Sequence, residues 1–168
     1  SAISTARVNF LAHLLDNGAE ENLGFEDGKF PPEKTIYLTL LRNTGIHRRI
    51  GREYLLGEPH DDNFMPLWNA CETFLDSTKE KPRKLGELIK ILRSRPFKLK
   101  QGVIDLWLPT FLIIKKNDYS LYNDAGVYVH TITREVLDIM QKSPAGFSVK
   151  AFNVEGVKLD LFSKYREA

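Results

Sequence analysis

Two clusters of arginine and lysine carry the residue types best suited to binding an anion. The first flanks a Pro-Phe pair and comprises Arg93, Arg95, Lys98 and Lys100. The second follows a glycine and comprises Arg48, Arg49 and Arg52. Cations grouped in this way bind the phosphates of nucleic acids without reading the base sequence. Both clusters are therefore candidate phosphate contacts, although a solvated helix face or a surface that docks an acidic domain has a similar composition.

The charge of the chain is uneven along its length. With 24 basic and 22 acidic side chains, the net charge of +2 is too small to imply nucleic-acid binding by itself. Residues 79–100, however, contain nine Lys or Arg against two Glu, whereas residues 1–63 contain ten acidic and seven basic residues. The sequence therefore predicts a local basic segment on a nearly neutral protein.

Other side chains with chemical potential are scattered. The four histidines, at positions 13, 47, 60 and 130, are far apart and have no partner at metal-ligand spacing. His60-Asp61-Asp62 is interpreted as a solvated turn before a helix, and no phosphate-binding loop or dinucleotide fingerprint is present. Ser143 and Ser148 lack the strand-to-helix setting of a hydrolase nucleophile. We expect no catalytic residue, metal or cofactor in this chain.

Cys71 is the single cysteine and lies within an apolar helical stripe. A lone cysteine cannot form an internal disulfide, and a reduced, cytoplasmic setting is expected. Its place in the stripe predicts a small buried hydrophobe rather than a nucleophile. The chain begins "SAISTARVNF", without an initiator methionine, which suggests a piece of a longer protein.

The elements that must position these residues are mostly helical. Apolar residues at three- and four-residue spacing predict helices at residues 3–15, 64–75 and 85–92, with further helices beginning at Pro31-Pro32-Glu33, after Thr133 and at residues 157–165. Short strands are predicted at residues 53–56 and 147–152. "YSLYNDAGVYVHTI", residues 119–132, predicts a β-hairpin turning at Asn123-Asp124-Ala125-Gly126.

Residues 103–114, "VIDLWLPTFLII", form the most apolar stretch. A membrane span needs about 20 apolar residues, so this shorter stretch, which contains Asp105 and Pro109, is not expected to cross a membrane. A helix that reads DNA needs a face of polar or basic side chains, and the nine apolar residues of this stretch leave no such face. It predicts a helix that is apolar all round and buried in the core, with a kink at Pro109.

Together these elements predict an α+β protein that is mostly helical. A helical subdomain is expected at residues 1–78, and the polar stretch "STKEKPRK" marks the boundary. A winged-helix-like subdomain is expected at residues 79–168, with the hairpin as its wing. Because the helix in the recognition position is hydrophobic, it is expected to belong to the core of this subdomain.

Residues 95–150 resemble a recurring segment of large bacterial ATP-binding proteins of unassigned function, including ATPases of BREX-type phage-defence systems. The similarity is carried by Pro96-Phe97, Gly102-Val103-Ile104, Leu121-Tyr122-Asn123-Asp124 with Gly126, and Pro144 with Phe147. Upstream, "FPPEKTIYLTLLRNTGIH" and "FMPLWNACETFL" are also similar. This sequence departs from the pattern at Asn123 and Ala125, and the nucleotide-binding motifs of that family have no counterpart in it.

The resemblance implies a non-catalytic accessory or C-terminal region of such an ATPase. We expect a regulatory or DNA-contacting module, with the rest of the ATPase and duplex DNA as partners and a role in phage defence or DNA transactions. The expected contacts are Arg93, Arg95, Lys98, Lys100, Arg48 and Arg49. The alternative is a protein-interaction or oligomerisation scaffold that does not bind nucleic acid; an exposed apolar patch would favour it.

Overall fold

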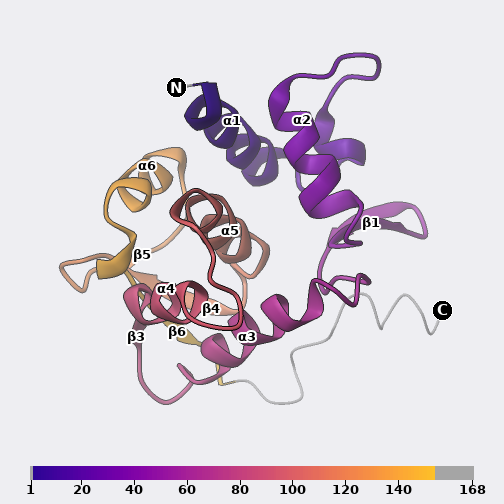
Figure 1. Ribbon diagram of the computed structural model, residues 1–168. Coiled ribbons are helices and arrows are strands. Elements are labelled where there is room, and N and C mark those ends of the chain that lie inside the picture. Colours follow the sequence, from indigo (N-terminus) through magenta and orange to yellow (C-terminus); the bar gives the residue numbers. More distant parts are fainter. Residues whose placement is uncertain (1, 154–168) are drawn as a thin grey trace. The chain divides into compact units, whose positions relative to one another are not determined.

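The computed structural model describes residues 2–153 (Figure 1). Helices make up 51% of an α+β fold that also contains two small antiparallel sheets, which confirms the predicted fold class. The described residues group into two compact units, one up to Trp68 and the other from Asn69 to Asn153. The helix expected at residues 157–165 lies outside the described residues.

The first unit begins with helices and ends with a hairpin. Its elements are α1 (Ala2–Asn17), the 3-10 turn η1 (Glu21–Gly24), α2 (Pro32–Tyr37), the π-helical turn η2 (Leu38–Arg42), β1 (His47–Ile50) and β2 (Glu53–Leu56). The helices predicted at residues 3–15 and from Pro31-Pro32-Glu33, and the strand at 53–56, are confirmed. The strand β1 was not predicted; it pairs antiparallel with β2.

A buried polar chain joins α2, β1 and the turn that follows α1. The Tyr37 hydroxyl lies 2.8 Å from Nδ1 of His47, and Nε2 of His47 lies 3.0 Å from the Gly18 carbonyl oxygen. Because a carbonyl only accepts, Nε2 carries the proton, and Nδ1 accepts from the tyrosine. Burial lowers the pKa of His47 and raises the pKa of Tyr37 to about 12. Both side chains therefore remain neutral at pH 7.

The second unit places its helices beside a four-stranded sheet (Figure 1). Its elements are α3 (Met65–Asp76), which crosses the boundary between the units, β3 (Arg83–Lys84), α4 (Leu85–Arg93), α5 (Gln101–Ile114), β4 (Tyr119–Tyr122), β5 (Tyr128–Val129), α6 (Arg134–Lys142), the 3-10 turn η3 (Pro144–Gly146) and β6 (Ser148–Ala151). The strands lie in the order β3-β6-β4-β5, and every neighbouring pair is antiparallel. The predicted hairpin and the helix capped by Thr133 are confirmed.

The helix α5 is the most deeply buried element of the second unit. Eight of its residues from Ile104 to Ile113 are buried, among them Trp107 and Phe111 at 1% exposure. The expectation of a buried apolar helix is thus confirmed for most of its length. It is wrong for the first turn, where Val103 is 47% exposed, because the helix enters the core only after this turn.

Proline inside α5 creates a polar problem that a neighbouring helix resolves. Pro109 has no N–H, so it cannot bond the carbonyl of Asp105, four residues earlier. The side-chain amide of Gln141, from α6, donates to that carbonyl at 3.0 Å. In the same turn of the helix, the Thr110 hydroxyl donates to the Leu106 carbonyl at 2.7 Å. A polar contact from α6 thereby compensates the gap in the α5 hydrogen-bond ladder.

The sheet has a buried side and an open side. Tyr119 and Leu121 on β4 pair with Ala151 and Val149 on β6, and all four side chains are buried. On this inner side the Tyr119 hydroxyl donates to the Leu112 carbonyl of α5 at 2.6 Å. Alternate residues point to the opposite, outer side.

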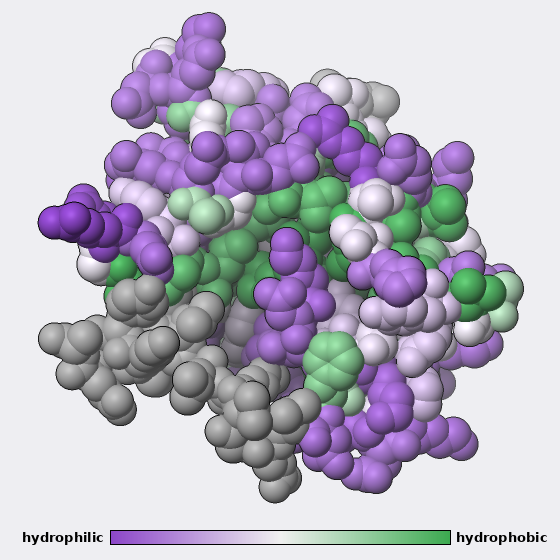
Figure 2. Space-filling view, turned by 180° about the vertical axis from the view of Figure 1, so that it is seen from behind, coloured by the Kyte–Doolittle hydropathy of each residue, from purple (hydrophilic) through white to green (hydrophobic). Residues whose placement is uncertain are grey.

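The surface is mixed in character. Hydrophilic residues cover much of the side seen from behind, with hydrophobic residues exposed in smaller areas between them (Figure 2). No helix within residues 2–153 combines the length and the apolar character needed to cross a membrane.

Replacing His47 is expected to change how stability depends on pH. Since burial holds the pKa of folded His47 below its unfolded value of about 6.5, the unfolded state takes up a proton first as pH falls. The contribution of neutral His47 to the free energy of unfolding is therefore fully present above about pH 6.5. It is lost as the pH falls below this value, by at most about 1.4 kcal/mol per pH unit. In urea titrations from pH 8 to pH 5, His47→Gln should lose this component and the exposed control His130→Gln should keep it. Identical profiles for wild type and His47→Gln would contradict it.

Thr78 is expected to be the most sensitive threonine of the second unit. Its buried hydroxyl accepts from the Ala151 N–H at 2.7 Å and donates to the Leu75 carbonyl at 2.7 Å. Thr78→Val leaves a buried N–H unpaired, so urea unfolding should show a loss of about 1–3 kcal/mol. Thr73→Val, an exposed position on α3, should change stability by less than about 0.5 kcal/mol. Equal effects at both sites would refute the assignment.

Candidate nucleic-acid interface

The first basic cluster lies on the connection between α4 and α5. The connection is closed by two backbone hydrogen bonds, from Lys98 N–H to the Ser94 carbonyl and from Leu99 N–H to the Leu92 carbonyl, each 2.9 Å long. Lys98 has a φ of +47°, in the left-handed region that lysine rarely adopts. The result is a compact turn, called here the basic turn (residues 93–100), rather than an open loop.

All four predicted cations of the basic turn are exposed: Arg93, Arg95, Lys98 and Lys100. Within residues 2–153, none of them is paired with a carboxylate, whereas Arg83 and Lys115 of the same unit are. Burial opposes a charge on Lys115, but Glu72 and Asp118 outweigh it and raise its pKa. The structure therefore separates cations that hold the fold together from cations that face solvent, and the turn belongs to the second kind.

The N-terminus of α5 adds to the positive character of the basic turn. Lys100 is the residue before the first turn of α5, and exposed Gln101 and Gly102 follow it. Helix N-termini carry a partial positive charge and free N–H groups, so a lysine there is electrostatically unfavourable. A bound anion would relieve this repulsion and meet the N–H groups as well.

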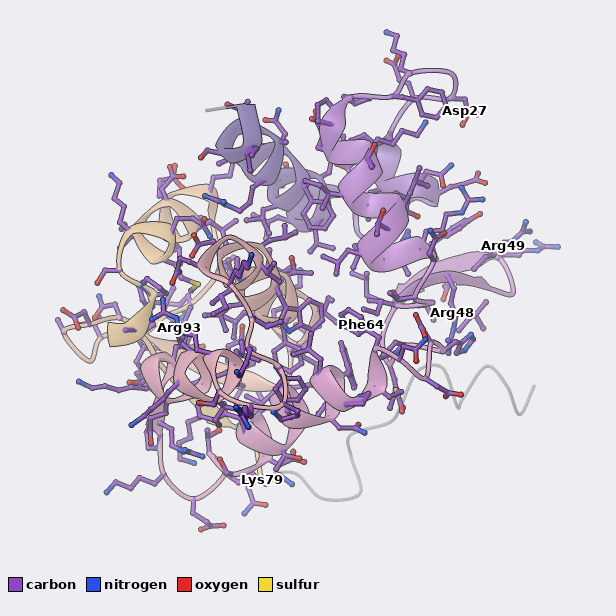
Figure 3. All side chains as sticks on the ribbon, viewed as in Figure 1. Asp27, Arg48, Arg49, Phe64, Lys79 and Arg93 are labelled. Atoms are coloured by element: carbon purple, nitrogen blue, oxygen red, sulfur yellow. The ribbon has the colours of Figure 1, made fainter. Side chains whose placement is uncertain are left out.

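The second basic cluster does not form a joint site. Arg48 and Arg49 are neighbours on β1, so their side chains leave opposite sides of the hairpin. Arg48 is half-buried and its guanidinium lies 3.5 Å from the Gly45 carbonyl, a structural setting. Arg49 is exposed, and its side chain extends away from the β1–β2 hairpin (Figure 3). Its Nε donates to the Gly51 carbonyl in the hairpin turn at 3.0 Å. The two clusters also belong to different compact units.

The hairpin expected to act as a wing has a turn held by hydrogen bonds and carries no cation at its tip. The Asn123 side chain accepts from the N–H groups of Ala125 and Val127, both at 3.0 Å, and Gly126 has a φ of +76°. Asp124 lies against Gly146, where an added Cβ would be 3.2 Å from the Cβ of Asp124. The carboxylate of Asp124 repels phosphate, so the turn at the tip of this hairpin is a poor contact for DNA.

The remaining candidates for chemistry are structural. Cys71 is buried, as predicted, and burial raises the pKa of its thiol to about 12 although the Trp107 indole donates to the sulfur at 3.4 Å. No group of three or more His, Cys, Asp or Glu among residues 2–153 could hold a metal ion. The pairing of Tyr37 with His47 was missed from the sequence, because ten intervening residues give no signal of it.

Comparisons with protein-family models, with curated proteins and with solved structures found no match to this chain.

Proposed function

We propose that this chain is a non-catalytic, DNA-contacting module of a larger cytoplasmic bacterial ATPase involved in phage defence or other DNA transactions. The observation that supports the proposal best is the basic turn, with its exposed cations and no carboxylate partner among the described residues. The resemblance of residues 95–150 to such ATPases supplies the context of the parent protein.

The mode of contact follows from which residues are accessible. The helix α5 is buried and offers no polar face to base edges, so it does not read sequence. The cations of the basic turn instead meet phosphates, which all DNA sequences share. Non-specific contacts of this kind give dissociation constants of roughly 10⁻⁴–10⁻⁶ M at physiological salt. The module would thus position its parent protein on a duplex rather than select a site.

A second candidate is a protein-interaction scaffold that does not bind nucleic acid. It is favoured by apolar side chains in solvent, such as Ile3 at 77% and Phe30 at 73% exposure. These two residues belong to the first unit, whereas the basic turn belongs to the second. A scaffold would show a concentration-dependent mass in light scattering that salt does not abolish, because apolar contacts are not screened.

The double charge reversal Arg95→Glu/Lys98→Glu is expected to weaken binding to a labelled duplex. The change removes two phosphate contacts and adds repulsion, so fluorescence anisotropy at about 50 mM salt should show roughly tenfold weaker binding. The slope of log affinity against log salt should also become shallower by about 0.9 per lost contact.

The matched control is Lys116→Glu/Lys142→Glu, which makes the same change in net charge at exposed positions of the same unit. It should bind the duplex more tightly than the turn variant does. Equal losses in the two variants would mean that only net charge matters, and an unchanged affinity in the turn variant would exclude the basic turn.

A further inference from the structure

The outer side of the four-stranded sheet carries an ordered row of side chains. Lys84 on β3 pairs with Ser148 on β6, Ser148 with Tyr122 on β4, and Tyr122 with Tyr128 on β5. Directly opposed residues point to the same side of a sheet, so these four form one continuous row across all four strands. Lys84 and Tyr128 are exposed, the tyrosine at 46%.

A second row lies beside the first. Ser120 on β4 pairs with Lys150 on β6, two residues from the first row on each strand. His130, which directly follows β5, packs edge-on against Tyr128 with ring centroids 4.6 Å apart, and Tyr128 lies 6.0 Å from Tyr122. The outer side thus presents three contacting aromatic rings on its β4–β5 half and two lysines on its β3–β6 half.

The charged side chains of the two rows, apart from His130, are both lysines, Lys84 and Lys150. Neither row contains an acidic residue, and Asp124 lies in the hairpin turn against Gly146. Lys150 donates to the Lys79 carbonyl at 2.7 Å, a neutral partner, and forms no ion pair with a carboxylate among the described residues. With strands about 4.8 Å apart, Lys84 lies roughly 10 Å from Tyr122, on the same side of the sheet.

We propose that this outer side, the aromatic sheet face (Lys84, Ser120, Tyr122, Tyr128, His130, Lys150 and Ser148), binds single-stranded nucleic acid. Unpaired bases stack on the tyrosine and histidine rings, and the lysines meet the phosphates. Stacking requires bases that are not already paired, so the face discriminates single strands from duplex. An apolar protein partner fits less well, because the two rows together contain two lysines and two serines and offer it little apolar surface to bury.

The face is separate in chemistry from the basic turn proposed above. The turn has four cations and one half-buried aromatic residue, Phe97. The face has two exposed rings, Tyr128 and His130, beside the half-buried Tyr122, as well as lysines. The turn therefore meets the phosphates of a duplex, and the face meets bases. A protein with both would hold a duplex next to an opened strand.

The test uses the full chain and labelled 12-nucleotide strands of oligo-dT and oligo-U in fluorescence anisotropy. Tyr122→Ala/Tyr128→Ala should weaken binding by about 5- to 150-fold for each base that loses its stack. Tyr128→Phe keeps the ring and should bind as wild type does. Phe30→Ala, which removes an exposed ring from the first unit, is the matched control and should have no effect.

A second variant guards against misfolding of the double mutant. Lys84→Glu changes one exposed side chain and should both weaken binding and reduce the salt slope by about 1. Tighter binding of oligo-U than of oligo-dT would identify RNA as the ligand, and the reverse would identify DNA. Wild-type protein that binds neither strand, or affinities unaffected by both the tyrosine and the lysine variants, would overturn the proposal.

The two proposals fail independently. Arg95→Glu/Lys98→Glu should lose duplex binding and retain single-strand binding to within a few fold, since the stacking rings are unchanged. If duplex binding fails and single-strand binding persists with the expected dependence on Tyr122, only the basic turn is excluded. If single-strand binding fails while duplex binding follows the turn variant, only the aromatic sheet face is excluded.

Discussion

The second unit depends on the burial of α5. A helix buried this deeply must satisfy every backbone polar group within the protein, and Pro109 makes that impossible within the helix alone. Gln141 of α6 supplies the missing donor, and the carbonyl of Leu112 in turn accepts from Tyr119 of the sheet. One helix is thereby linked by hydrogen bonds to both a neighbouring helix and the inner side of the sheet. The core is held by polar contacts at its edges as well as by apolar packing.

This burial also determines where the protein can meet a partner. With α5 buried in the core, two accessible features of the second unit are the connection that leads into α5 and the side of the sheet that faces away from it. The first carries arginine and lysine, and the second carries aromatic rings and lysine. The internal salt bridges, such as Lys115 with Glu72 at 2.6 Å, occupy other cations. The fold therefore gathers unpaired positive charge at the basic turn, although the net charge of the chain is only +2.

Local signals in the sequence were sufficient for the helices and the hairpin, because apolar spacing and the Asn123-to-Gly126 turn act over a few residues. The strand β1 has no such signal: "HRRI" shows no apolar alternation, and it becomes a strand through pairing with β2 across Gly51, whose φ is +64°. The strand β6 lies between β3 and β4, and its pairing with β3 joins residues more than 60 positions apart, so it depends on the whole fold. The basic residues could be found from the sequence, but their lack of partners and the rows across the sheet could not, since both depend on tertiary contacts and register.

The contact between Asp124 and Gly146 ties the tip of the hairpin to the chain that enters β6. Because Asn123 also binds two N–H groups of the turn, the hairpin is constrained at its tip and along its paired strands. The backbone that carries Tyr122 and Tyr128 is therefore held in place before a ligand binds, which lowers the entropic cost of association. Glycine at position 146 thus contributes to recognition without touching a ligand, because the absence of a Cβ there leaves room for the Asp124 side chain at the tip of the hairpin.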